Sequence, residues 1–384
     1  MKKILFVIVI VLSLFGTAKA DVIQEEIEKL SEENIVQIDR FVKEINQKTG
    51  SDFLIVDLKT YLLQVLKGQQ PFDLNKIFAG ILKLFFKELY SSFNLLIQLL
   101  VLGVIGSILM NLHSSFEKES ISEIAFLAIY LIFIIIAVKS FSEAMGIGRQ
   151  AIDSMVDFMQ SILPVLITML VSVGSFTSAA FLKPLVIVTV QFTAHVMRDF
   201  IIPLILFMTA VKIVGNISDK FSLNKMGDFL KTLSTASISV LLSIFLGVIT
   251  VQGFSSSIAD GVISRTAKYT VGTFLPVVGG LLADSVDAVI GASLLIKGAI
   301  GSYGLLVILA IAAFPLIKIF SLVIIYRFVA ALIEPISDKR IVNSLSEVAN
   351  SMTYILAVLA SITVMMFFTI TAVIGSANIT TMLR

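Results

Sequence analysis

Four ionisable side chains, Asp284, Asp287, Lys297 and Lys318, lie within long apolar stretches of this chain. Asp284 and Asp287 are three residues apart, so they share one face of a helix. A charge at bilayer depth costs about 2.5–3.5 kcal/mol on insertion scales, and such residues pair with one another or mark a route for ions and polar solutes. The carboxylates and amines therefore either line an ion or polypeptide path or pair as structural links, and the residues alone leave both roles open.

A second charged group, His195, Arg198 and Asp199, interrupts the apolar stretch 185–214. Buried ionisable groups usually pair with one another, so we interpret these three residues as structural. If the stretch is a hairpin of two short helices, Arg198 and Asp199 form its tip near a membrane interface. If it is one long helix, Pro203 kinks it near the middle.

Patterns typical of enzymes and cofactor sites are missing. The chain has no cysteine, and His113 and His195 are its two histidines. This composition removes thiolate metal sites and thiol nucleophiles. No HExxH, GxSxG or GxxxxGK[ST] string occurs, which argues against zinc proteases, α/β-hydrolases and P-loop ATPases. We expect no enzymatic activity and no cofactor, so a partner or an ion gradient must supply the energy for any powered transport.

Composition predicts a polytopic membrane protein. Of the 384 residues 57% are hydrophobic and 15% are charged, against about 45–50% and about 25% in soluble domains. A net charge of +2 does not favour nucleic acid as a partner. Runs near the length of about 20 apolar residues that a span needs predict an all-α bundle with about eight spans. They lie near 93–112, 121–138, 158–182, 185–214, 234–254, 275–297, 301–333 and 353–375.

The N-terminal region has the pattern of an exported segment. Residues 1–20 form a signal peptide with two lysines, a short apolar stretch and the cleavage motif Ala18-Lys19-Ala20. An uncleaved first span is the alternative. Residues 21–92 are rich in charge and carry apolar residues at helical spacing, which predicts an extracytoplasmic helical segment. It is either a docking surface for a partner or a helix lying on the membrane, or else a small cap packed on the bundle.

Prolines indicate an internal duplication. Pro276 follows Pro164, and Pro315 follows Pro203, at the same separation of 112 residues. Each proline is a candidate helix break. Duplicated units with Pro-interrupted spans point to a translocation path at the repeat interface, and units of three crossings each would be inverted repeats. We therefore expect two leading spans, a first membrane repeat and a second membrane repeat, over residues 93–138, 139–254 and 255–384.

Several motifs in the C-terminal half resemble those of the stage III sporulation protein AE family of endospore-forming bacteria. The matching segments are Phe245–Gly253, Asp260–Val262, Arg265–Lys268, Phe274–Val277, Ala292–Leu295 with Lys297, and Ile311–Pro315 with Ile317 and Lys318. The resemblance implies a multi-pass protein of the mother-cell membrane around the forespore, with its mature N-terminus outside the cytoplasm. It also implies membership of the channel complex that joins the two compartments and supports forespore development.

The partners implied by the resemblance are the other stage III A-operon proteins, among them a secretion-type ATPase and ring-forming proteins, and the forespore protein Q. Membrane lipid is the other expected partner. Combined with the duplication, the resemblance favours the membrane-embedded channel or export component of the complex. An ion-coupled secondary transporter with a site around Asp284 and Asp287, and a non-conducting membrane scaffold of the same complex, are the alternatives.

Overall fold

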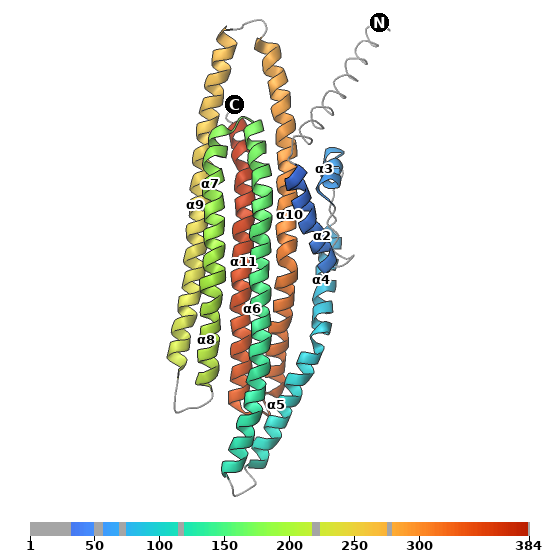
Figure 1. Cartoon of the computed structure of the whole chain (residues 1–384), viewed down its shortest axis with the longest axis vertical. Coiled ribbons are helices and arrows are strands. Elements are labelled where there is room, and N and C mark those ends of the chain that lie inside the picture. The colour runs from blue at the N-terminus through green and yellow to red at the C-terminus, as the bar shows by residue number, and fades with distance from the viewer. Residues whose placement is uncertain are drawn as a thin grey trace.

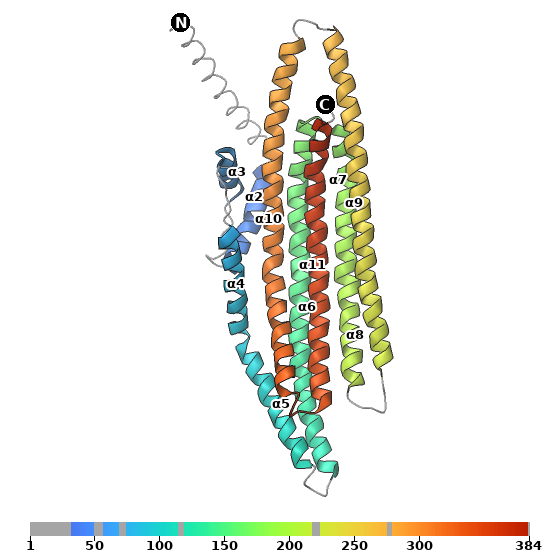
Figure 2. The same cartoon turned by 180° about the vertical axis from the view of Figure 1, so that it is seen from behind.

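A computed structural model describes residues 32–49, 57–68, 74–113, 119–216, 223–274 and 279–382. These ranges form helices, most of which lie side by side in an elongated bundle (Figures 1 and 2). The predicted all-α membrane fold is therefore confirmed in its class. The elements are α2 Glu32–Thr49, α3 Leu58–Leu66, α4 Leu74–Ser91, α5 Phe93–His113, α6 Glu119–Ser172, α7 Phe176–Val196, the π-helix η2 Met197–Ile201, α8 Ile202–Gly215, α9 Asn224–Phe274, α10 Gly279–Ile333 and α11 Lys339–Met382.

Four helices are much longer than a membrane span. Helices α6, α9, α10 and α11 have 54, 51, 55 and 44 residues, or about 65–80 Å each at about 1.5 Å per residue. The hydrocarbon core of a bilayer is about 30 Å thick. Within the described residues, four helices are long and apolar enough to cross a membrane, or up to five if the bent pair α4–α5 is one span. The spans are Leu127–Ser172, Asn224–Val251, Ile290–Ile333, Lys339–Ser376 and the pair Ile77–Ser91 with Phe93–Ile108.

The structure thus has fewer candidate spans than the eight expected, and α6 gives one reason. The charged stretch 139–157, expected to separate two spans, continues the same helix. Phe141, Met145, Ile152 and Met155 recur there at helical spacing and are buried against the bundle. The expected span 158–182 is also wrong. Here a turn at 173–175 divides the segment between α6 and α7.

Helix α10 joins two further expected spans, 275–297 and 301–333, into one helix from Gly279 onward. Two glycines at the start of the second expected span allow close packing and do not break the helix. A Cβ atom at Gly301 would overlap the side chain of Ile374 on α11, and a Cβ atom at Gly304 would overlap Ile162 on α6. The sequence signal of a breaker is the same as that of a close helix contact, since both need the smallest residue.

Helices α7 and α8 form one run through η2, so the hairpin suggested for 185–214 is wrong and the single long helix is confirmed. In the π-turn, the N–H of Ile202 donates to the carbonyl of Met197, five residues earlier. Pro203 follows directly in the first turn of α8. Proline lacks an N–H, so one helical hydrogen bond is missing at this point. The helix accommodates this interruption with a single wider turn.

The described elements show no internal repeat. Pro164 lies within α6 and Pro315 within α10, whereas Pro276 lies outside the described residues. The turn at 173–175 corresponds, at the separation of 112, to residues 285–287 inside the uninterrupted α10. Matched segments therefore have different local structures.

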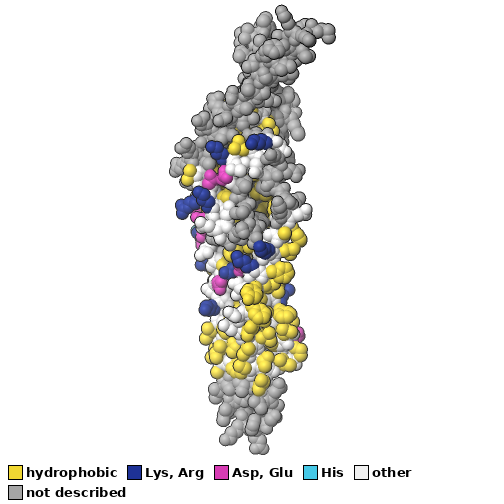
Figure 3. All heavy atoms as spheres, turned by 90° about the vertical axis from the view of Figure 1, so that its right-hand side faces the viewer, with side chains coloured by type: hydrophobic (Ala, Val, Ile, Leu, Met, Phe, Trp, Pro, Cys, Tyr) yellow, Lys and Arg dark blue, Asp and Glu magenta, His cyan; other side chains and the backbone are white. Residues whose placement is uncertain are grey.

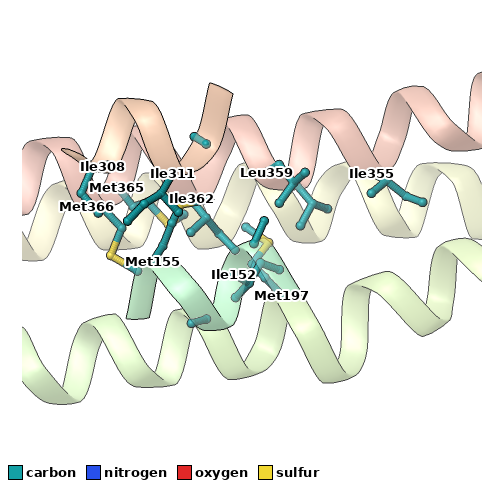
Figure 4. Close-up of a cluster of buried hydrophobic side chains, with 14 of the residues drawn as sticks. Ile152, Met155, Met197, Ile308, Ile311, Ile355, Leu359, Ile362, Met365 and Met366 are labelled. Atoms are coloured by element: carbon teal, nitrogen blue, oxygen red, sulfur yellow. The ribbon is translucent and has the colours of Figure 1, made fainter. Parts of the chain in front are cut away.

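The centre of the bundle is a core of isoleucine, leucine and methionine from α6, η2, α10 and α11 (Figure 4). Unbranched methionine side chains fill irregular gaps between long helices. The labelled residues are Ile152, Met155, Met197, Ile308, Ile311, Ile355, Leu359, Ile362, Met365 and Met366.

Helices α2 and α3 pack on one side of this bundle, against α6 and α10. The ring of Phe41 meets Phe158 edge-on, with centroids 5.9 Å apart. The hydroxyl of Tyr61 lies 2.9 Å from Ser302 Oγ, and its ring lies beside Tyr303. Helices α2 and α3 therefore pack as a cap on the bundle, one of the three arrangements expected for the N-terminal segment.

Candidate functional site

Lys297 is the most deeply buried charged side chain that the structure describes. It is 1% exposed on α10, and its Nζ donates to the carbonyl oxygen of Ile374 on α11 at 2.8 Å. The absence of a Cβ at Gly301, one turn further along, allows α11 to approach this closely. Ser293, one turn earlier, is also buried, and its Oγ has no hydrogen-bond partner.

Among the described residues, no carboxylate pairs with Lys297. The side chains of Asp284 and Asp287 themselves lie outside the described residues, so their surroundings stay a prediction.

Lys318, by contrast, has a carboxylate partner. Its Nζ lies 3.1 Å from Oε1 of Glu143 on α6, and both side chains keep contact with the surface. Of the roles expected for Lys318, pairing between helices is the one observed. Glu143 was not singled out in the sequence because the stretch around it resembles a loop.

A pocket of about 200 Å³ lies beside this pair, enclosed by α2, α6 and α10. Pro315 is in its wall, and the carbonyl of Ile311 loses its helical hydrogen bond because proline has no N–H. The lining is mostly apolar and includes the polar side chains of Glu44, Gln150, Ser154 and Lys318. The pocket can therefore hold water or a small amphipathic group at a helix irregularity. Its lining residues are Phe41, Glu44, Ile45, Ile147, Gln150, Ala151, Ser154, Ala310, Ile311, Phe314, Pro315 and Lys318.

The charged group of η2 forms a network across two helices. Arg198 Nη1 donates to Asp153 on α6, while its Nε and Nη2 bind the two carboxylate oxygens of Asp199 at 2.9 and 2.8 Å. His195 Nδ1 lies 2.7 Å from Asp199. The expected pairing of His195, Arg198 and Asp199 is confirmed, and Asp153 is the partner that the sequence did not reveal. A shallow pocket of about 380 Å³ borders the network on the α6–α7 side.

A third network, around Lys212, joins three helices. Lys212 Nζ on α8 lies 3.0 Å from Asp228 Oδ1 on α9 and 3.3 Å from Glu347 Oε1 on α11. Lys212 is 12% exposed and Asp228 67%. No spacing in the sequence links these residues, since 135 positions separate Lys212 from Glu347.

Some of the other predicted site residues lie outside the described residues. Pro276, together with Ala18 and Ala20 of the predicted cleavage motif, is outside the described residues. Of the three remaining predicted breaks, Pro164 and Pro315 lie inside continuous helices and Pro203 lies in the first turn of α8. In the described part of the chain, no group of three or more His, Cys, Asp or Glu side chains has the geometry to hold a metal ion.

The fold and these networks define a polytopic helical membrane protein in which several charged residues link packed helices. A model of the stage III sporulation protein AE family matches residues 56–377. The stage III sporulation protein AE of Bacillus subtilis (strain 168) is 32% identical over 326 residues, which cover 85% of this chain and 82% of that protein. The chain therefore belongs to the stage III sporulation protein AE family, as its motifs indicated. No solved structure matches it.

Proposed function

We propose that this protein is the membrane-embedded channel or export component of the sporulation complex that links mother cell and forespore. Membership of the family supports a role in sporulation and in the stage III A assembly. The observation that carries the conduit role is Lys297, whose buried amine donates to a backbone carbonyl of α11. A buried charge without a counter-charge is costly, so an amine kept at this position favours a polar route along α10.

The proposed path follows α10. Asp284, Asp287, Lys297 and Lys318 all lie on this helix, over 34 residues or about 50 Å. The pocket beside Pro315 lies near the Lys318 end. Polar groups along one continuous helix, with a freed backbone carbonyl at its proline, are what a hydrated route through a helical bundle requires.

The proposed partners are the other stage III A-operon proteins, including a secretion-type ATPase and ring-forming proteins, and the forespore protein Q. The chain has no nucleotide-binding pattern, so the ATPase is the proposed energy source. The proposed location is the mother-cell membrane, with cleavage after Ala20 and the mature N-terminus outside the cytoplasm. N-terminal sequencing of the membrane-purified protein should begin at Asp21, and retention of Met1 would contradict the cleavage.

A non-conducting scaffold is the second candidate function. The pairs Lys318–Glu143 and Arg198–Asp153 favour it, because each neutralises a charge by joining two helices. In a scaffold, the charged residues link helices and no continuous polar route exists. An ion-coupled transporter requires a binding site around Asp284 and Asp287, and no observation among the described residues favours one.

Cysteine accessibility tests the conduit. The native chain has no cysteine, so single cysteines can be placed at Asp284, Asp287 and Lys297 without removing any other. In assembled complexes, we expect positions 284 and 287 and their helical neighbours to react with a membrane-impermeant thiol reagent. Cysteine at the fully buried Ile300 is the unreactive control. If 284–297 is wholly unreactive and Asp284→Leu and Asp287→Leu sporulate normally, the scaffold is the correct function.

A further inference from the structure

Helices α4 and α5 present one continuous apolar stripe away from the bundle. Phe78 is 65% exposed, Phe86 63% and Tyr90 84%. The opposite face of α4 packs inward through Leu84, so this helix is apolar on two sides. Figure 3 shows hydrophobic side chains gathered in the lower part of the described surface on this side, with most charged side chains above them. The nine residues of the stripe, each three or four positions from the next, are Phe78, Leu82, Phe86, Tyr90, Phe93, Ile97, Val101, Ile105 and Ile108.

The stripe continues from α4 to α5 through a bend of 44°. None of its nine positions is charged. Residues 78–108 cover about 45 Å along the helices. This length exceeds a hydrocarbon core of about 30 Å and equals a whole bilayer of about 40–45 Å with its headgroup layers.

One boundary of the hydrocarbon is indicated by the α10–α11 connection. Ser107 Oγ donates to the carbonyl of Ile336 in this connection. Glu334 and Lys339 are exposed there, and such a polar connection does not lie in hydrocarbon. Ser107 therefore lies close to one membrane surface.

The position of the second membrane surface follows from the thickness of the hydrocarbon core. Twenty residues, about 30 Å, separate Ser107 from Lys87. Lys83 and Lys87 are exposed, and each directly follows a residue of the stripe. Phe86 and Tyr90 lie at the same level. Aromatic rings with neighbouring lysines are typical of the membrane–water interface, because the rings are amphipathic and lysine extends its amine to the phosphates.

We propose that the outer face of α4 binds the headgroup layer of an acidic phospholipid bilayer. Lys83 and Lys87 contact lipid phosphates. Phe86 and Tyr90 lie at the boundary between hydrocarbon and headgroups, and Phe78 lies at the outer edge of the headgroup layer. A lipid surface fits better than a second copy of the chain, because the stripe has the length of a bilayer and is continuous with the apolar face of α5. Helices α2 and α3, which expose Arg40 and Lys59, then lie beyond the bilayer on this side.

Depth measurements on the full chain test the position of α4. Single cysteines at Phe78, Leu82, Tyr90 and Val101 are labelled with nitroxide, and the protein is placed in nanodiscs of phosphatidylglycerol and phosphatidylcholine. We expect Val101 to be accessible to oxygen and protected from a water-soluble nickel reagent, with nickel accessibility rising steadily through Tyr90 and Leu82 to Phe78. Protection of Leu82 and Phe78 from both reagents would show that protein covers α4, and full nickel accessibility at Tyr90 would place α4 in water. Either result overturns the proposal.

The lysine contacts have a separate test. In acidic nanodiscs the label at Leu82 should lie measurably deeper than in pure phosphatidylcholine, and Lys83→Gln with Lys87→Gln should abolish that difference. The matched control replaces two exposed lysines, Lys59→Gln on α3 with Lys67→Gln directly after it, and should leave the difference unchanged. An equal depth in both lipids for the native lysines refutes phosphate binding. Because these experiments use the purified chain, their failure is independent of the proposed conduit.

Discussion

Two glycines one turn apart on α10 should respond to alanine with opposite signs. A Cβ atom at Gly301 would overlap the side chain of Ile374 on α11, whereas a Cβ atom at Gly298 meets nothing within 4 Å. Overpacking a tight contact costs about 1–3 kcal/mol. Replacing an unhindered helical glycine by alanine gains about 0.5–1 kcal/mol. We therefore expect Gly301→Ala to lower the free energy of unfolding and Gly298→Ala to raise it, a separation of about 1.5–4 kcal/mol.

Denaturant titration of the purified protein in detergent micelles, followed by circular dichroism, measures both changes. A double-mutant cycle identifies the contact, since Ile374→Ala removes the atoms that the new methyl group overlaps. Ile374→Ala alone should cost about 2–5 kcal/mol. In the Gly301→Ala background it should cost less, by a coupling energy of about 0.5–3 kcal/mol. If both glycine variants shift stability in the same direction, or if the cycle shows no coupling, the close α10–α11 contact is refuted.

Three further substitutions test the charged networks and the cap. Lys297→Met should either leave the free energy of unfolding unchanged or raise it by about 1–4 kcal/mol, because an apolar side chain of similar volume replaces a buried charge. It should nevertheless reduce heat-resistant spore counts, and normal sporulation would remove the functional role of the amine. Lys212→Met should cost about 1.5–3 kcal/mol by leaving two carboxylates without their shared cation, measured by denaturant titration, and an unchanged midpoint would contradict the three-helix link. Ile38→Asp, at a fully buried position of α2, should expose α2 to limited proteolysis. Arg40→Ala should not, since an exposed ion pair contributes only about 0–1 kcal/mol to stability. Equal digestion of both variants would show that α2 is not held by its apolar face.

The sequence by itself determined the class of the protein and several local features. High apolar content and a low charge fraction required helices in a membrane, because only helices or closed barrels satisfy their backbone groups in lipid. Apolar residues at helical spacing predicted a helical segment over residues 21–92, and its described parts form α2, α3 and α4. The pairing of His195, Arg198 and Asp199 was predicted because buried ionisable groups usually pair with one another.

Tertiary structure alone decided how many helices these segments form and which charges meet. The charged residues of 139–157 are typical of a loop, but α10 and α11 pack against the apolar face of this segment. This packing makes the segment part of α6, which has 54 residues. The close contact of Gly301 with Ile374 on α11 is visible only in the folded bundle. Lys318 meets Glu143, Arg198 meets Asp153 and Lys212 meets Glu347 across 45 to 175 positions of sequence. Such contacts leave no periodic signal, because they depend on the mutual rotation and register of separate helices, which side-chain packing sets only when the bundle assembles.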